Sequence, residues 1–153
     1  MSQVEQRLTA IGLALPPAPA PVANYVGAVQ VGDLVFVSGH GPVKDGKLTY
    51  RGKLGRDFSV AEGYEAARLV MLNALASLRG AIGDLDRVKR VVKLLGMVNS
   101  TPDFFQQPEV INGASDLLVE LFGDRGRHAR SAVGMAVLPF DIAVEIEMIV
   151  QVA

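Results

Sequence analysis

The last part of the chain carries the pattern that most restricts its fold. Residues 131–138 are small and apolar on both faces of an extended segment. Pro139 ends that run, because proline has no N–H to donate to a β-ladder. Residues 144–150 then alternate in polarity, and one face carries Val144, Ile146, Met148 and Val150. The pattern predicts two strands joined by a short turn at residues 139–141.

The segments before these strands alternate between strand-like and helix-like patterns. Ser59 and Glu62 form a capping box, in which each side chain bonds a free backbone N–H at a helix start. Gly80 and Gly83 mark the end of that helix. The predicted order is strands over 25–30 and 34–38, a loop over 44–57, the capped helix, a strand over 88–98, a helix over 108–122 and the two C-terminal strands. This order predicts an α+β fold, in which a mixed sheet carries both helices on one face.

The first 21 residues have a different character. Residues 2–13 predict a short amphipathic helix, and the proline-rich run over 15–21 predicts an extended arm. An arm this short does not separate two domains. We therefore interpret residues 1–153 as one domain, in which residues 1–21 form an appendage on the surface of a core made by residues 22–153.

Composition excludes several classes of protein. The chain has 153 residues, a net charge of −1 and no cysteine. A net charge this small gives no strong electrostatic attraction for nucleic acid. The absence of cysteine excludes disulfides, thiol nucleophiles and thiolate metal sites. Its two histidines lie far apart in sequence, so we expect no metal site. No run reaches the ~18 apolar residues of a membrane helix, and the N-terminus lacks the apolar core of a signal peptide. We expect a cytoplasmic protein with no membrane partner.

The predicted sheet has more apolar surface than its helices can hide. The strands over 88–98, 131–138 and 144–150 are all rich in apolar residues. Some other surface has to cover the face away from the helices. The pattern therefore predicts self-association, for which closed symmetry is the usual outcome.

Arg130 and Glu145 are the residues of the C-terminal strands whose chemistry suggests a site. An arginine held at a strand end presents a planar fork that matches the two oxygens of a carboxylate. A carboxylate such as Glu145 can position or activate water as a general base. Each also has a purely structural reading. Arg130 could pair with a surface acid. Glu145 could lie with Glu147 on a solvated face, or one of the two could pair with a lysine across an interface.

The same strands resemble the signature of a known family. The segments Ala129-Arg130-Ser131, Leu138-Pro139 and Val144-Glu145-Ile146-Glu147 resemble the signature of the YjgF/RidA family, the reactive intermediate deaminases, also called L-PSP endoribonuclease-like. Upstream, Tyr25 followed by Ser38-Gly39-His40-Gly41-Pro42 is similar to the family's Tyr and Ser-Gly-Gln-x-Pro. Val110-Ile111-Asn112 is similar to its Val-Asn. The resemblance covers roughly residues 22–153.

The resemblance implies a chorismate-mutase-like fold, assembled as a barrel-like homotrimer with ligand sites in the clefts between subunits. It implies that Arg130 binds the substrate carboxylate and that Glu145 orients water and substrate. The other residues that it places in the cleft are Tyr25, Ser38, Gly39, His40, Asn112, Ser131 and the backbone of Ala132. It implies no metal and no organic cofactor. From the residues alone, Tyr25 could be an edge aromatic, and Asn112 could bond local backbone at the surface.

The chain departs from the family pattern at several positions. His40 replaces the usual glutamine, and His128 precedes the Ala-Arg pair where proline or a small residue is usual. Ala132 stands where cysteine is frequent, and Gly134 where a charged residue is frequent. An imidazole at position 40 or 128 could act as a base near neutral pH, or could be a buried, hydrogen-bonded side chain.

The leading hypothesis is an enzyme that hydrolyses a reactive 2-imino or 2-enamino acid to the 2-keto acid and ammonia without a cofactor. A non-catalytic protein that binds small carboxylates through the same arginine is the first alternative. An endoribonuclease or translation inhibitor is the second. Two clusters of positive charge, Lys89-Arg90 with Lys93 and Arg125 with Arg127, lack interleaved aromatic residues for stacking bases. We therefore interpret them as solvated faces, and a nucleic-acid partner is less expected.

Overall fold

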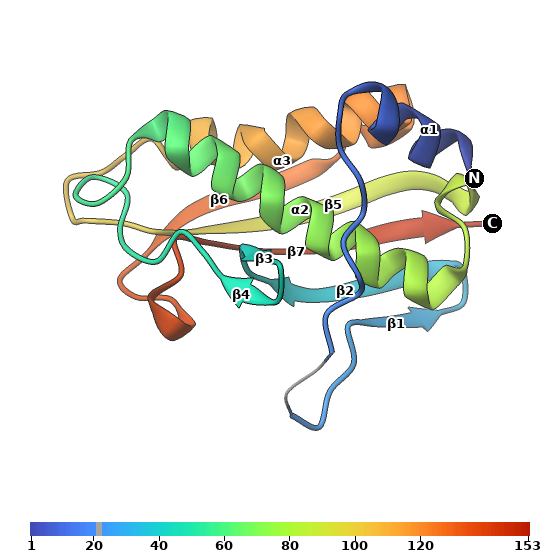
Figure 1. Ribbon diagram of the computed structural model, residues 1–153, viewed down its shortest axis with the longest axis horizontal. Helices are drawn as coiled ribbons and strands as arrows, with labels where there is room; N and C mark the ends of the chain where they lie inside the picture. Colours follow the sequence, from blue (N-terminus) through green and yellow to red (C-terminus); the bar gives the residue numbers. More distant parts are fainter. Residues whose placement is uncertain (21–22) are drawn as a thin grey trace.

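The computed structural model describes residues 1–20 and 23–153. This part of the chain forms a five-stranded sheet in the order β1-β2-β7-β5-β6, with a separate two-stranded hairpin, β3–β4 (Figure 1). The β5–β6 pair is parallel and the other neighbours in the main sheet are antiparallel. The elements are α1 (Gln3–Ala10), β1 (Ala28–Val31), β2 (Leu34–His40), β3 (Val43–Lys44), β4 (Lys47–Leu48), α2 (Val60–Ile82), η1 (Leu85–Arg87), β5 (Val88–Asn99), α3 (Gln107–Phe122), η2 (Gly123–Gly126), β6 (Ala129–Met135), η3 (Pro139–Asp141) and β7 (Val144–Val152).

Helices α2 and α3 lie side by side across one face of the sheet, as Figure 1 shows. The predicted mixed sheet with two helices on one face is therefore confirmed. The start of α2 follows from its cap, because the Ser59 side chain accepts from the Glu62 N–H and the Glu62 side chain accepts from the Ser59 N–H. The helix ends at Gly83, whose φ of 86° is accessible to glycine at little cost. None of the helices in residues 1–20 and 23–153 is long and apolar enough to span a bilayer.

Strand β6 is shorter than predicted. It pairs with β5 until Met135 meets Asn99, where β5 itself ends, so the chain beyond Met135 has no ladder to continue. The turn that follows contains Phe140 and Asp141 at positive φ, 58° and 60°. The predicted loop over 44–57 likewise begins inside the small β3–β4 hairpin.

The prediction that the N-terminal helix is a surface appendage is wrong. Val4 and Leu8 of α1 are 0% and 1% exposed and belong to the main hydrophobic core. The backbone N–H groups of Gln3 and Val4 donate to the Asp86 carboxylate at 2.7 and 3.0 Å, and Arg7 Nη1 donates to the Leu121 carbonyl at 2.6 Å. The sequence could not show these contacts, because their partners lie in η1 and α3. The predicted boundary between arm and core, residues 21–22, lies outside the described residues.

The face of the sheet away from the helices carries exposed apolar side chains. Alternation along the strands puts Val29, Val31 and Phe36 on this face, together with Val133 of β6. These side chains are 50%, 63%, 45% and 38% exposed, respectively. Such a cluster on one side of a sheet is typical of a surface that another chain covers.

We expect Leu8→Ala to lower the free energy of unfolding by about 2–5 kcal/mol, because it leaves a cavity in the core beneath α1. Urea denaturation at fixed protein concentration measures this. The matched control is Thr9→Ala, at the next and exposed position of the same helix, which should change stability by less than about 0.5 kcal/mol. Equal stabilities for wild type and Leu8→Ala would restore the appendage interpretation.

Candidate functional site

Arg130 lies in β6 beneath α3. Its Nη1 donates to Ser115 Oγ at 3.1 Å and its Nη2 donates to the Pro108 carbonyl at 3.3 Å. Both partners belong to α3, so the guanidinium lies on the helix-covered side of the sheet. Within residues 1–20 and 23–153, Arg130 forms no ion pair with an acidic side chain. The structural reading of Arg130 as the partner of a surface acid thus finds no support, and the guanidinium keeps N–H groups for a ligand.

Three other predicted site residues lie at the same end of the sheet. Asn112 is half-buried in α3 at helical spacing from both Pro108 and Ser115, which places it on the side of the helix that faces Arg130. Ser131 Oγ accepts from Lys93 Nζ at 3.4 Å, and Ala132 packs against the core. In the described part of the chain β6 pairs with β5 alone, so its outer backbone edge is open to a ligand or another chain.

The departure at Gly134 has a local cause. A Cβ atom at this position would lie 2.8 Å from Gln107 Nε2 and 3.4 Å from Ser100 Oγ. The first distance is shorter than real contacts allow, so a larger residue would have to displace the Gln107 side chain at the start of α3.

A second group of predicted residues lies around the bulge in β2. The register between β2 and β7 shifts between Val37 and His40, so Ser38 and Gly39 form the bulge. A Cβ atom at Gly39 would lie 2.8 Å from Glu145 Oε2, so only glycine lets the Glu145 carboxylate lie this close to the backbone. Ser38 Oγ donates to the Val26 carbonyl at 2.6 Å. The bulge therefore shapes the surroundings of the Glu145 carboxylate.

These residues line an open cleft of about 1400 Å³. Tyr25, Ser38, Gly39 and Glu145 form part of its wall. The proline-rich arm, residues of α2, the β3–β4 hairpin and residues 139–142 also line it. Tyr25 precedes β1 rather than lying within it, and its side chain is 52% exposed. The cleft is large enough for a small organic acid and its side chain.

Glu145 has the electrostatics of a proton acceptor. Burial raises the pKa of the Glu145 carboxyl above its ordinary value of 4.5, and the negative charge of Glu147 raises it further. A carboxylate with a raised pKa is a stronger base than a solvated one. The reading of Glu145 as a fully solvated side chain does not fit its half-buried position.

His40 is 7% exposed, and both of its ring nitrogens are engaged. Its Nδ1 lies 2.6 Å from the Ser38 carbonyl, which can only accept, so Nδ1 carries the proton. Its Nε2, 2.7 Å from Ser77 Oγ, then accepts from the serine hydroxyl. Burial lowers the pKa of His40, partly opposed by the bond to Ser38. The structure supports the reading of His40 as a buried side chain that holds the bulge in place.

One chain does not bring Arg130 and Glu145 together. The guanidinium of Arg130 contacts α3 on one face of the sheet. Glu145 alternates with Val144 and Ile146, which are buried beneath the helices, so its side chain emerges on the opposite face. Strand β5 also separates their strands. A single small ligand can touch both side chains only if they come from different copies of the chain.

Phe140 is a residue of the cleft that the sequence analysis did not select. It lines the cleft beside Glu145, and its side chain is 69% exposed. The Phe140 carbonyl accepts from Arg51 Nε at 2.9 Å, and the Asp141 carbonyl accepts from the Gly52 N–H at 2.7 Å. These bonds hold the residue at its positive φ. In the sequence, the segment Pro139-Phe140-Asp141 indicated only where a strand ends.

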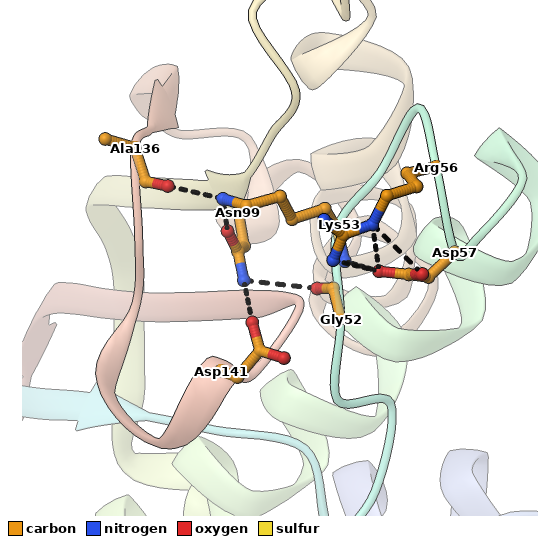
Figure 2. A network of polar contacts seen from close by, with 7 residues as sticks. All are labelled: Gly52, Lys53, Arg56, Asp57, Asn99, Ala136 and Asp141. Carbon is orange, nitrogen blue, oxygen red and sulfur yellow. Dashed lines mark hydrogen bonds and ion pairs between the residues drawn. The ribbon is translucent and has the colours of Figure 1, made fainter.

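A buried asparagine supports this turn (Figure 2). Asn99, 0% exposed at the end of β5, donates through Nδ2 to the Gly52 carbonyl at 3.2 Å and to Asp141 Oδ1 at 3.1 Å. Its Oδ1 accepts from Lys53 Nζ at 2.6 Å, and Lys53 also donates to the Ala136 carbonyl. The network ties the segment after β4 to the connection between β6 and β7, and so fixes the rim of the cleft.

No group of three or more histidine, cysteine, aspartate or glutamate side chains in the described residues is arranged to hold a metal ion. We call the group around Arg130 and the group around Glu145 the two candidate half-sites. Their polar groups are an arginine, an asparagine amide, a glutamate, hydroxyls and backbone. Such a set can bind a small carboxylate and activate water.

The chain is similar in sequence and fold to several known proteins. The profile of the family described as "YjgF/chorismate mutase-like, putative endoribonuclease" matches residues 5–151. Protein TCP17 of Trypanosoma cruzi is 48% identical over 150 residues, 97% of this chain and 94% of that protein. The crystal structure of Atu1372 from Agrobacterium tumefaciens, a protein of unknown function, is 47% identical, covers 99% of this chain and 93% of its own, and superposes with a TM-score of 0.93.

A second similar structure carries a ligand. The structure of Escherichia coli TdcF with bound serine is 26% identical, covers 89% of this chain and 94% of its own, and gives a TM-score of 0.64. The fold is that of a chorismate-mutase-like α+β protein. The chain belongs to the YjgF/RidA family.

The buried state of His40 predicts a pH effect on stability. Burial lowers the pKa of His40 below its ordinary value of 6.5. As the pH falls, the His40 imidazole of the unfolded chain therefore takes up a proton before that of the folded chain. The stabilisation that neutral, buried His40 provides is complete above pH 6.5 and is lost as the pH falls below it. Urea denaturation between about pH 5 and pH 7, at constant protein concentration, should show a smaller loss of stability in His40→Gln than in wild type. The pKa of His128 is also lowered, so His40→Gln/His128→Gln should show a still smaller loss. An unchanged pH dependence in His40→Gln would contradict the prediction.

Proposed function

We propose that the protein hydrolyses reactive 2-imino acids, and their 2-enamino tautomers, to 2-keto acids and ammonia. The observation that carries the proposal is the pair of half-sites. One presents an arginine without an acidic partner in the described residues, and the other presents a half-buried glutamate of raised pKa against a glycine bulge. The first suits the carboxylate of an imino acid, and the second suits the water that attacks its C=N carbon.

The proposed site is shared between subunits. Arg130 and Asn112, with Ser131 and the backbone of Ala132, come from one copy, and Tyr25, Ser38, Gly39 and Glu145 come from the next. The open edge of β6 and the apolar face that includes Phe36 are the surfaces through which the copies would meet. Closed three-fold symmetry lets each copy supply both halves, and gives the homotrimer that we propose.

In the proposed reaction, Arg130 binds the carboxylate in both the ground state and the transition state. Glu145 takes a proton from water as the oxygen attacks the C=N carbon, and it returns that proton to the nitrogen, which gives a carbinolamine. The hydroxyl proton of this intermediate then passes through Glu145 to the nitrogen, the C–N bond breaks as the C=O bond forms, and ammonia leaves. Each contact becomes stronger as the neighbouring copy and the substrate displace water from the open cleft. The binding of serine by the similar E. coli TdcF supports a small amino-acid-like carboxylate as ligand. The alternative, a protein that binds keto acids without turnover, would use Arg130 alone.

The proposed assembly predicts a particle near three times the 16.3 kDa mass of the chain by light scattering at micromolar concentration. Phe36→Glu places a charge on the apolar face and should dissociate the particle. The control is Thr9→Glu, exposed on the helix side of the molecule, which should leave the mass unchanged. A monomeric wild-type protein would rule out the shared site.

The reaction is tested by ammonia and keto-acid release from 2-imino acids generated in the assay by an amino-acid oxidase. Arg130→Lys keeps the charge but loses the planar fork, so we expect binding of 2-oxobutanoate to weaken at least about tenfold, and Arg130→Ala to weaken it further. Glu145→Gln should retain binding and lose turnover. Wild-type turnover should fall as the pH drops through the raised pKa of Glu145, because only the carboxylate form accepts a proton.

The control for the charge change is Arg127→Ala, whose side chain is 74% exposed and pairs with Asp124; it should leave both binding and turnover unchanged. Binding with no turnover in wild type would favour the carboxylate-binding alternative. If Arg130→Ala binds 2-oxobutanoate as wild type does, the site assignment fails.

A further inference from the structure

A chain of hydrogen bonds runs from the Arg130 guanidinium into the protein. Arg130 Nη1 donates to Ser115 Oγ at 3.1 Å, and the same oxygen lies 2.9 Å from His128 Nε2. His128 Nδ1 lies 2.6 Å from the Gly126 carbonyl. The chain thus connects β6, α3 and the end of η2. Neither Ser115 nor His128 belongs to the carboxylate-binding group described above.

The direction of each bond in the chain follows from its ends. The Gly126 carbonyl can only accept, so His128 Nδ1 carries a proton, and the Nε2 of the neutral ring is an acceptor. The guanidinium can only donate, so Ser115 Oγ accepts from Arg130 and its own proton points to His128 Nε2. A hydroxyl that donates to one partner is a better acceptor for another, because bonds in a chain polarise one another. The neutral imidazole therefore strengthens the bond that holds Arg130.

The surroundings favour the neutral imidazole. Burial lowers the pKa of His128 and the positive charge of Arg130 lowers it further, against the bond to Gly126, which raises it. Several of the other charged groups on the neighbouring elements have partners of their own. These are Asp116 with Tyr64, Glu120 with Arg68, Asp124 with Arg127, Arg125 with the Val88 carbonyl, and Lys93 with Ser131.

We propose that Ser115 and His128 are positioning residues, which hold the Arg130 guanidinium in the orientation that receives the substrate carboxylate. The inference rests on the proposed function. An arginine side chain has many rotamers, and one that is held before the ligand arrives loses less freedom on binding. Ser115 and the Pro108 carbonyl each take one N–H, on the side of the fork toward α3. The remaining N–H groups are left for the ligand.

The other half-site contains the same arrangement. His40 Nδ1 bonds the carbonyl two residues earlier, as His128 Nδ1 does, and His40 Nε2 accepts from Ser77 of α2. In each case a helix serine bonds a histidine, His40 at the end of β2 or His128 directly before β6, and the pair stabilises the backbone or side chain beside the proposed ligand. Both ring nitrogens of each of the two histidines that depart from the family pattern are therefore engaged in hydrogen bonds.

The test compares Ser115→Ala with Ser115→Thr, which keeps a hydroxyl, using 2-oxobutanoate binding and imino-acid turnover. We expect Ser115→Ala to raise both the Kd and KM about three- to tenfold with kcat nearly unchanged, because it weakens binding equally in the ground and transition states. Ser115→Thr should restore most of the affinity. His128→Gln keeps an acceptor for the serine and should bind more tightly than His128→Leu.

A double-mutant cycle separates positioning from a general structural effect. If Ser115 acts through Arg130, Ser115→Ala should have no further effect on affinity in an Arg130→Ala background. An equal loss of affinity in both backgrounds would overturn the proposal, as would wild-type affinity in Ser115→Ala while Arg130→Ala abolishes binding. Unchanged binding in Arg130→Ala would refute the proposed function, and the positioning role with it. Should His128→Leu fail to fold, the Ser115 cycle decides alone.

Discussion

The alternation of side chains along β7 is the constraint on which the rest of the structure depends. This strand lies between β2 and β5, and Val144, Ile146, Met148 and Val150 are at most 2% exposed beneath the helices. A shift of one residue would turn this apolar set outward, so the register is strongly determined. The same alternation forces Glu145 and Glu147 onto the other face. The position of the catalytic carboxylate that we propose is thus a consequence of core packing.

That constraint also separates the two halves of the proposed site. Arg130 lies on the helix side of the sheet, where its guanidinium donates to Ser115 and Pro108 of α3. Glu145 emerges on the uncovered face. The glycine bulge at Gly39 lets the backbone of β2 approach the Glu145 carboxylate. Each half-site is well supported within one chain, yet neither is sufficient for the proposed chemistry. The reaction that we propose therefore requires self-association, which would also cover the apolar face.

Much of the fold could be predicted because its signals are local. The cap at Ser59, the glycine at position 83 and the polarity of residues 144–150 depend on neighbours within a few positions, and these elements were predicted well. The burial of Val4 and Leu8, the network around Asn99 and the exposed Phe140 were missed. Each depends on partners far along the chain, and a buried asparagine has no local mark that distinguishes it from an exposed one.

The sequence by itself determined the order of helices and strands, the apolar faces and the family motifs around Arg130 and Glu145, because periodicity and short motifs are written into adjacent residues. Only the tertiary structure decided that both histidines are engaged by helix serines, that α1 belongs to the core, and that Arg130 and Glu145 point to opposite faces of the sheet. These facts follow from which strand pairs with which and from where each helix packs. Long-range pairing of this kind is set by the total packing of the molecule, and no single segment encodes it.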